Sequence, residues 1–364
     1  MRAIRLHTFG PAEHLTYEEV PDPAPAPGQV RIAVTAAGVH LLDTAIRAGI
    51  KGPLPELPEL PTIPGREVAG TVDAVGEGVD ASRLGQRVVA HIGFAPGGYA
   101  ELVVTEASRL HEIPDGMDDA EAVALIGTGR TTMGILQFAE LTQDSVAVIP
   151  AAAGGIGTLL VQYAKHAGAT VIGLAGGPEK TARVTANGAD LAVDYTDPDW
   201  PDEVRTYLSK LGGTGVPGAT VVFDGVGGEP GRAAVDLLAT GGSHLVFGWS
   251  GKGPHDGEPL TFTDEQLAAR GITQTNVLGP TMMRKAGGDK AGDDRTGDGR
   301  AGGDRADGGR GDANPIRTLE LAALAEAAKG HFTPAVQRYP LAQAAAAHAD
   351  LENRRTTGKV VLIP

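Results

Sequence analysis

A glycine-rich turn, AAAGGIG from Ala151 to Gly157, is the segment whose residue types best suit a chemical task. It follows the apolar run SVAVIP (Ser145 to Pro150) and precedes a segment with helical apolar spacing. Glycine allows close approach of the backbone to a ligand, and the free N–H groups of a helix N-terminus bind phosphate. Strand, turn, helix and next strand follow in the order of a dinucleotide-binding unit. We therefore expect the pyrophosphate of a nicotinamide dinucleotide to bind at Ala153, Gly154, Gly155, Ile156 and Gly157.

The end of the next strand bears on which dinucleotide binds. An NAD-selective site places an acidic residue there for the ribose hydroxyls. Here the strand ends in Leu174-Ala175-Gly176-Gly177 and is followed by Pro178-Glu179-Lys180. Lys180, together with Arg183, could face a 2′-phosphate; alternatively, both are solvated cations on a helix surface. We predict NADPH as the cofactor.

Composition excludes several other chemistries. The chain has 364 residues and no Cys, so thiolate zinc sites, disulfides and thiol nucleophiles are impossible. Its formal net charge of −14 argues against a nucleic-acid partner or an anionic membrane. The sequence offers neither the apolar stretch of a signal peptide nor a run long enough for a membrane span, so we expect a cytoplasmic protein.

The elements that must position the glycine turn fall into two patterns. From residue 1 to about 121, short strand-like runs alternate with Gly and Pro; Val30, Ile32 and Val34 alternate at period two. This pattern is typical of a compact β-barrel or sandwich. From about 122 onward, apolar strands alternate with helical segments, which predicts a doubly wound parallel α/β sheet.

Residues 284–313 contain only Gly, Asp, Ala, Thr, Lys and Arg after Arg284, with a cation at every fifth position from 285 to 310. Such a segment has no large apolar side chain and cannot bury a core. We predict a disordered surface insertion; an interaction tail is the alternative.

Four segments together resemble a known family. They are AAGVHLLDTAIRAG (36–49), PTIPGREVAGTVDAVGEGV (61–79), the AAAGGIG turn and the ending LENRRTTGKVVLIP. In order and over nearly the whole chain, they look like the medium-chain dehydrogenase/reductase superfamily. Within it the chain is most similar to the zinc-independent quinone oxidoreductases, the zeta-crystallin-like branch.

The resemblance implies a GroES-like catalytic domain (1–121), a Rossmann NADPH-binding domain (122–270), and a return to the catalytic domain (271–364) that includes the insertion. It implies an active site between the domains and favours a homodimer. It places Thr131 beside the nicotinamide, and Lys180 and Tyr195 near the adenosine phosphate. It further implies cofactor contacts for Phe247, Gly248, Trp249 and Arg354.

A catalytic metal finds little support in the sequence. Zinc-dependent relatives carry Cys where this chain has His40 and His where it has Arg66; His40 and Glu67 alone are a poor zinc set, since about three protein ligands are needed. His40 also departs from the quinone oxidoreductase branch, which usually has Asn there. It could donate a proton to the reduced acceptor, or act as a neutral hydrogen-bonding substitute for Asn.

We therefore expect an NADPH-dependent, zinc-independent enzyme that transfers a hydride to a quinone or an α,β-unsaturated carbonyl compound. A conjugated acceptor delocalises the resulting anion and needs no Lewis acid. Two alternatives stay open. One is a 2-enoyl thioester reductase of the same superfamily, and the other is a non-catalytic NADPH-binding regulatory protein.

Overall fold

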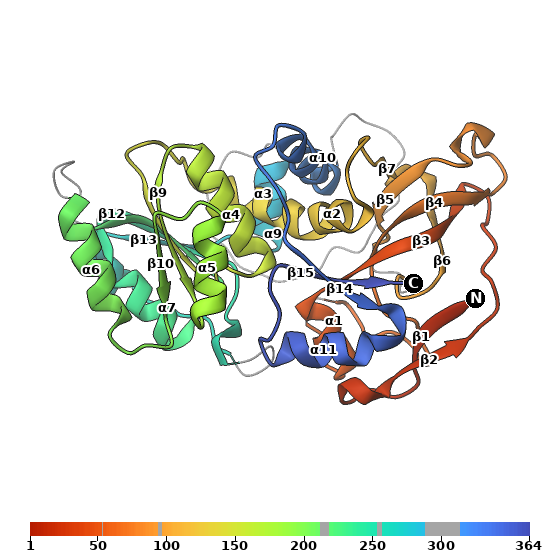
Figure 1. The fold of residues 1–364 in the computed structure, drawn as a ribbon, viewed down its shortest axis with the longest axis horizontal. Coiled ribbons are helices and arrows are strands. Elements are labelled where there is room, and N and C mark those ends of the chain that lie inside the picture. Colours follow the sequence, from red (N-terminus) through yellow and green to blue (C-terminus); the bar gives the residue numbers. More distant parts are fainter. Residues whose placement is uncertain (53, 94–96, 212–217, 253–256, 288–313) are drawn as a thin grey trace.

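The structure, a computed structural model, describes residues 1–52, 54–93, 97–211, 218–252, 257–287 and 314–364. Its two large sheets lie at opposite ends of an elongated molecule, with a group of helices between them (Figure 1). Among the described residues, none of the helices combines the length and apolar character that a membrane span requires.

The sheet near the termini contains most of the strands from the first third of the chain. Its order is β14-β15-β3-β4-β5-β7, and β6 pairs with β3. The N-terminal strands of this sheet are β3 (Gln29–Val39), β4 (Glu67–Val75), β5 (Arg87–His91), β6 (Leu102–Glu106) and β7 (His111–Glu112). A separate hairpin joins β1 (Arg2–Leu6) to β2 (Leu15–Glu19), and helix α1 (Leu41–Arg47) follows β3.

Strand β3 shows why the alternating pattern folds this way. Val30, Ile32 and Val34 point to the buried side, with exposed fractions of 0, 0 and 7%. They pack in one core with Val68, Val88 and Val103 from three other strands of the same sheet. The β-rich N-terminal part predicted from sequence is thus confirmed.

The second sheet has six parallel strands in the order β10-β9-β8-β11-β12-β13. Its strands are β8 (Val146–Pro150), β9 (Thr170–Ala175), β10 (Leu191–Asp194), β11 (Ala219–Asp224), β12 (Leu238–Val246) and β13 (Thr273–Asn276). The helices that follow its strands are α4 (Gly155–His166), α5 (Pro178–Ala186), α6 (Trp200–Leu211), α7 (Gly228–Val235) and α8 (Asp264–Arg270).

Both faces of this sheet are covered. Ile149 and Phe223 belong to the core that contains Leu159 of α4, whereas Val148 and Val222 belong to the core that contains Val204 of α6. Adjacent residues of one strand therefore enter different cores, which explains the continuous apolar runs in the sequence. The predicted doubly wound α/β fold is confirmed.

The end of the chain returns to the first sheet. Strands β14 (Val336–Pro340) and β15 (Lys359–Ile363) pair in parallel, and β15 runs antiparallel to β3. Helix α11 (Ala344–Glu352) lies between these two strands in sequence and contacts α1. Residues more than 300 positions apart therefore share one sheet.

Two features differ from the sequence-based boundaries. Strand β13 belongs to the six-stranded sheet although it lies beyond residue 270; its polar sequence TQTN lacks the apolar run that signals a strand. Helix α9 (Pro280–Ala286) continues into the segment predicted to be disordered from 284, because Met282 packs against Gly134 and anchors the helix. Residues 288–313 of that segment lie outside the described residues. In the described residues β13 forms one edge of the six-stranded sheet. The homodimer expected from the resemblance stays a prediction.

A helical connection joins the two sheets. It consists of α2 (Asp119–Ala124), a π-helical turn (Leu125–Gly129) and α3 (Arg130–Leu136), and α10 (Pro315–Ala328) packs on it. The five residues of the π-helical turn are all buried. A π-helical turn frequently occurs at a functional site.

The buried strand that leads into the glycine turn provides a test of the fold. Ile149 in β8 is completely buried. We expect Ile149→Ala to lower the free energy of unfolding by about 2–5 kcal/mol, because it removes apolar contacts and leaves a cavity. Leu84→Ala is the control, since Leu84 is 48% exposed; its effect should stay within about 0.5 kcal/mol. Urea unfolding measures both, and equal effects would contradict the assigned burial.

Candidate functional site

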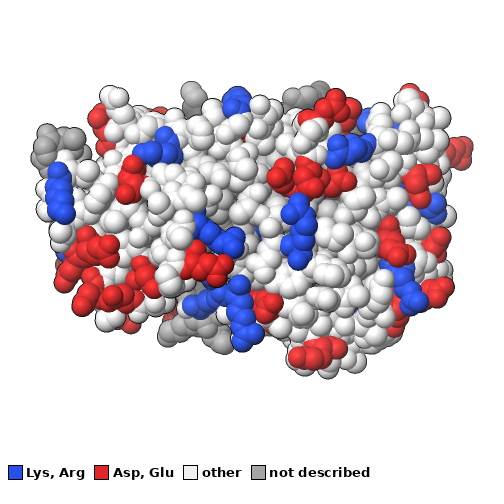
Figure 2. Space-filling model, viewed as in Figure 1, with Lys and Arg blue, Asp and Glu red and all other residues white. Residues whose placement is uncertain are grey.

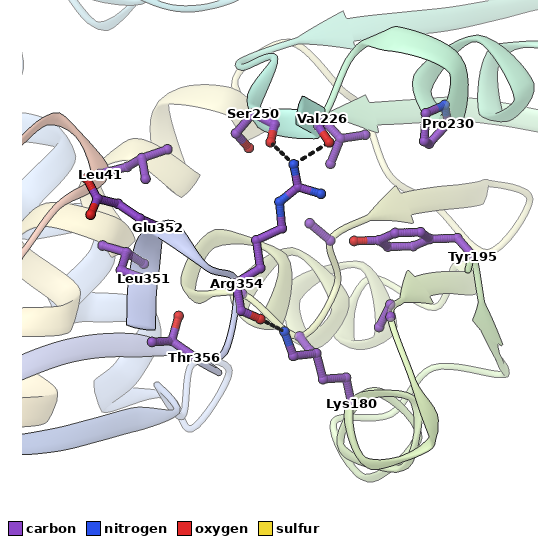
Figure 3. A pocket seen from close by; sticks show the side chains of 16 residues that line it. Leu41, Lys180, Tyr195, Val226, Pro230, Ser250, Leu351, Glu352, Arg354 and Thr356 are labelled. Carbon is purple, nitrogen blue, oxygen red and sulfur yellow. Dashed lines mark hydrogen bonds between the residues drawn. The ribbon is translucent and has the colours of Figure 1, made fainter. Parts of the chain in front are cut away.

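A cleft between the two large sheets is lined by five of the residues predicted to bind a cofactor (Figure 3). Ala153, Gly154, Lys180, Tyr195 and Arg354 all line it. Other lining residues were not anticipated from sequence; they include Leu41, Val226, Pro230, Ser250, Gly251, Leu351, Glu352 and Thr356. The cleft thus contains side chains from both halves of the molecule.

The glycine turn forms one wall, where β8 ends and α4 begins. Gly154 is the N-cap of α4 in an extended conformation, and the first turn of α4 carries no acidic residue. The first N–H groups of a helix lack intrahelical acceptors, so they can bind an anion. Gly157 has a packing role: a Cβ there would lie 2.4 Å from the Ala151 carbonyl oxygen.

The C-terminal segment presses against the same turn. The Gly358 N–H donates to the Ala153 carbonyl at 2.9 Å, and Gly154 and Gly358 form an isolated parallel bridge. A Cβ on Gly155 would lie 3.1 Å from Thr128 Cγ2. The turn is therefore fixed between the π-helical connection and the end of the chain.

Two basic residues meet across the cleft. Lys180 Nζ donates to the Arg354 carbonyl at 2.6 Å, and Arg354 Nη2 donates to the carbonyls of Ser250, at 2.9 Å, and Gly251 (Figure 3). Burial, followed by the Arg354 charge, lowers the pKa of Lys180. Both cations thus contact neutral carbonyls. In the view of Figure 1, several Lys and Arg side chains lie near the middle of the molecule, with acidic side chains beside them (Figure 2).

Two other predicted cofactor contacts rest against the chain itself. The Thr131 hydroxyl donates to the Gly127 carbonyl at 3.0 Å within the helical connection. The Phe247 ring covers Gly225, where a Cβ would lie 2.5 Å from Phe247 Cε2. Neither Thr131 nor Phe247 lines the cleft.

Five further predicted residues lie outside the cleft lining, and Arg183 points to another partner. Gly248 packs on the Gly225 backbone, and Trp249 is 41% exposed in a neighbouring hollow that shares Val226 and Pro230 with the cleft. Gly155, Ile156 and Gly157 do not line the cleft either. Arg183 Nη2 donates to Glu179 at 3.1 Å and does not line the cleft.

His40 lies at the N-terminus of α1, and its Nε2 contacts the Glu67 carboxylate. The other oxygen of Glu67, Oε2, accepts from Lys359 Nζ at 2.8 Å. Arg66 turns to Asp43, with Nη2 3.3 Å from Oδ1. In the part of the chain that the structure describes, no three His, Cys, Asp or Glu side chains are grouped as metal ligands. The contact between Glu67 and Lys359 was not predicted from sequence, in which the two residues lie 292 positions apart.

A buried network supports α1 from below. The Tyr99 hydroxyl lies 3.2 Å from Asp43 Oδ2 and 3.1 Å from His348 Nε2. Asp43 Oδ2 also accepts from the backbone N–H of His40 at 2.8 Å. Burial lowers the pKa of His348 to about 4. The network therefore needs a neutral His348 to keep α1 and His40 in place.

This network predicts a loss of stability in mild acid. Unfolded His348 takes up a proton near its ordinary pKa of 6.5, but folded His348 does so only near about 4. The stability is therefore complete above pH 6.5 and falls as the pH drops to 4, by about 3 kcal/mol for this group. The free energy of unfolding of His348→Gln should depend less steeply on pH in that range. His7→Gln, at a half-exposed site, is the control; an unchanged slope in His348→Gln would refute the assignment.

Comparisons with known proteins agree with this arrangement. Residues 26–115 match the family model described as alcohol dehydrogenase GroES-like domain, and residues 155–286 match the one described as zinc-binding dehydrogenase. A quinone oxidoreductase of Pseudomonas aeruginosa is 32% identical over 365 residues, covering 100% of this chain and 99% of the relative. A 2-haloacrylate reductase of a Burkholderia species is 30% identical, covering 100% and 98%. The crystal structure of Escherichia coli quinone oxidoreductase in complex with NADPH superposes with a TM-score of 0.77 at 26% identity, covering 100% of both chains.

Proposed function

Because the chain belongs to the quinone oxidoreductase branch of the medium-chain dehydrogenase/reductase superfamily, we propose that it reduces a quinone or an α,β-unsaturated carbonyl compound with NADPH. Oxidoreductase chemistry with a nicotinamide cofactor follows from the family. The choice of NADPH and of a conjugated acceptor is the proposal. The observation that carries it is the cleft in which the glycine turn faces Lys180 and Arg354.

The cleft suits a dinucleotide with an additional phosphate. The N-terminus of α4 presents free N–H groups, and its first turn contains no acidic residue that would repel an anion. Both features suit the pyrophosphate. Lys180 and Arg354 bond only to carbonyls in the described contacts, so a phosphate can recruit both charges. The strand end beside them, Ala175 and Gly176, offers no carboxylate for a ribose diol. Tyr195, half-buried at the same edge, provides an aromatic surface for the adenosine.

When bound, NADPH supplies the hydride, and the chain supplies alignment and exclusion of water. Apolar Leu41, Val226 and Leu351 narrow the cleft from both halves. We place the nicotinamide end near the π-helical connection. There the Thr131 hydroxyl donates to the Gly127 carbonyl, and the Glu67 carboxylate, which contacts His40, packs against Gly127. His40 is the candidate residue beside the acceptor.

A conjugated acceptor fits these residues better than a simple alcohol. Alcohol oxidation requires removal of a hydroxyl proton, which a metal ion usually makes possible. Here the carboxylate next to His40 already has an ammonium partner in Lys359. Reduction of a conjugated carbonyl compound yields a delocalised anion that needs no such ion. The relative named 2-haloacrylate reductase also supports a conjugated double bond as acceptor.

A panel of possible hydride acceptors, made up of quinones, enones, enoyl thioesters and aldehydes, tests the proposed activity. We expect the purified full-length chain to oxidise NADPH without added metal in the presence of quinones or enones, with chelators having no effect. Faster turnover of enoyl thioesters would favour the thioester reductase alternative. Binding of NADPH without turnover of any quinone, enone, thioester or aldehyde would instead indicate a regulatory protein and refute the proposal.

Cofactor choice is tested at Lys180. Loss of one charge-assisted contact to a phosphate costs about 1.5–3 kcal/mol, or roughly 10- to 100-fold in affinity. We therefore expect Lys180→Gln to raise KM for NADPH by roughly that factor and to change KM for NADH little. Arg183→Gln is the matched control on the same helix, because Arg183 pairs with Glu179; its effect should stay within about twofold. Equal loss for both cofactors would overturn the assignment of Lys180 to the 2′-phosphate.

A further inference from the structure

Glu67 is a fully buried carboxylate that two partners share. Lys359, at the start of β15 and only 5% exposed, donates from Nζ to Oε2 at 2.8 Å. The other oxygen, Oε1, contacts Nε2 of His40 at the N-terminus of α1. A buried charge is expensive unless it is paired and hydrogen-bonded, and here both oxygens are used.

Two glycines hold this carboxylate in place. A Cβ on Gly127, in the π-helical turn, would lie 1.7 Å from Glu67 Oε1. A Cβ on Gly38, in β3, would lie 2.6 Å from Oε2. No side chain larger than hydrogen fits at either position without moving Glu67. The carboxylate therefore has a fixed place between His40 and Lys359.

The chemistry of the pair determines where the His40 proton lies. Burial raises the pKa of Glu67, but the His40 and Lys359 contacts outweigh burial and leave that pKa well below its ordinary value. An ionised carboxylate can only accept a hydrogen bond. The proton in the contact therefore lies on Nε2 of His40, and a neutral imidazole then carries none on Nδ1.

The charges around His40 keep the ring neutral. Burial is the largest effect and lowers its pKa, and Lys359 lowers it further; Glu67 and Asp43 oppose them without reversing the shift. The residue opposite Glu67 on β5 is His91, whose pKa burial and Arg130 lower to about 3, so it adds no charge at neutral pH.

Arg66 is the remaining charged neighbour of this group. Its guanidinium pairs with Asp43, at 3.3 Å from Nη2 to Oδ1, so the Asp43 carboxylate has a cationic partner of its own. Among the described residues of β4, β5, β15, α1 and α3, the anion that contacts the His40 ring is therefore Glu67, and Lys359 is the cation that compensates it.

We propose that Glu67 and Lys359 are positioning residues that hold His40 as a neutral imidazole protonated at Nε2, leaving Nδ1 as a hydrogen-bond acceptor. Lys359 prevents Glu67 from drawing a second proton onto the ring. His40 then does not supply a proton to the reduced acceptor at neutral pH; that proton comes from solvent, and the hydride comes from the reduced cofactor. The placement of His40 beside the acceptor rests on the proposed function, but its protonation state does not.

Nuclear magnetic resonance of the full-length chain with ¹⁵N-labelled histidine tests the protonation state directly. The His40 signals are identified by their loss in His40→Gln. We expect a neutral ring with the proton on Nε2 at pH 7 and protonation only below the ordinary His pKa of 6.5. A proton on Nδ1, or an imidazolium at pH 7, would overturn the proposal without any variant having to fold.

The role of Lys359 is tested by removing its charge. In Lys359→Met, Glu67 loses its compensating partner, so the titration midpoint of His40 should rise by about one pH unit or more. Lys359→Arg should keep a midpoint close to that of the wild-type chain. Lys165→Met is the matched control, since Lys165 also donates to a carboxylate, Asp190, at 2.6 Å, but at the surface. An unchanged His40 midpoint in folded Lys359→Met would refute the role of Lys359.

Kinetic and binding measurements separate this inference from the proposed function. In Lys359→Met, the kcat should fall at acid pH, and the midpoint of this fall should equal the His40 titration midpoint measured by nuclear magnetic resonance. The dissociation constant for NADPH should stay within about twofold of the wild-type value. A purely structural role would change stability without producing that shared midpoint. A wild-type chain with the Nε2 tautomer that fails to bind NADPH overturns only the proposed function. A chain that binds and oxidises NADPH but shows the Nδ1 tautomer overturns only this inference.

Discussion

The docking of the C-terminal segment on the glycine turn is the constraint on which the site depends. One hydrogen bond, from the Gly358 N–H to the Ala153 carbonyl, joins the end of the chain to the start of α4. The residues near Gly358 in the sequence are thereby placed at two different sites. Lys359 reaches Glu67 in the first sheet, and Arg354 reaches Ser250 beside the second. A short stretch of chain thus serves the cofactor cleft on one side and the His40 pair on the other.

The charged residues on the two sides of this segment differ in their partners. In the cleft, Lys180 and Arg354 contact neutral carbonyls, so their charges stay available to an anionic ligand. Around His40, by contrast, the buried carboxylate of Glu67 already has its compensating cation in Lys359. The charges in the cleft thus favour binding of an anion, whereas the charges around His40 keep its ring neutral. An acidic protein can therefore bind a polyphosphate, because local pairing and not net charge determines the field inside a cleft.

The sequence was informative where the signal is local. The glycine turn and the apolar strand before it lie within one strand–turn–helix unit, and Lys180 lies on the helix of the next unit along the chain. Their arrangement follows from the period of the elements. The polar strand β13 has no such signal, and neither has the contact between Glu67 and Lys359, which lie 292 residues apart. Carbonyl partners such as Ser250 are also invisible in sequence, because every residue has a carbonyl. What could not be predicted is therefore the long-range pairing that the C-terminal segment creates.

The buried pair also explains why a histidine can occupy the start of α1 without becoming a permanent cation. A carboxylate alone would stabilise imidazolium, and a second buried charge would then have to be compensated. Because Lys359 already compensates Glu67, the cheaper state is a neutral ring that donates one hydrogen bond. Such a ring keeps its shape and charge across the neutral pH range. For the proposed reduction this means that alignment, and not a change in the charge of a side chain, is what the protein provides at the reacting atoms.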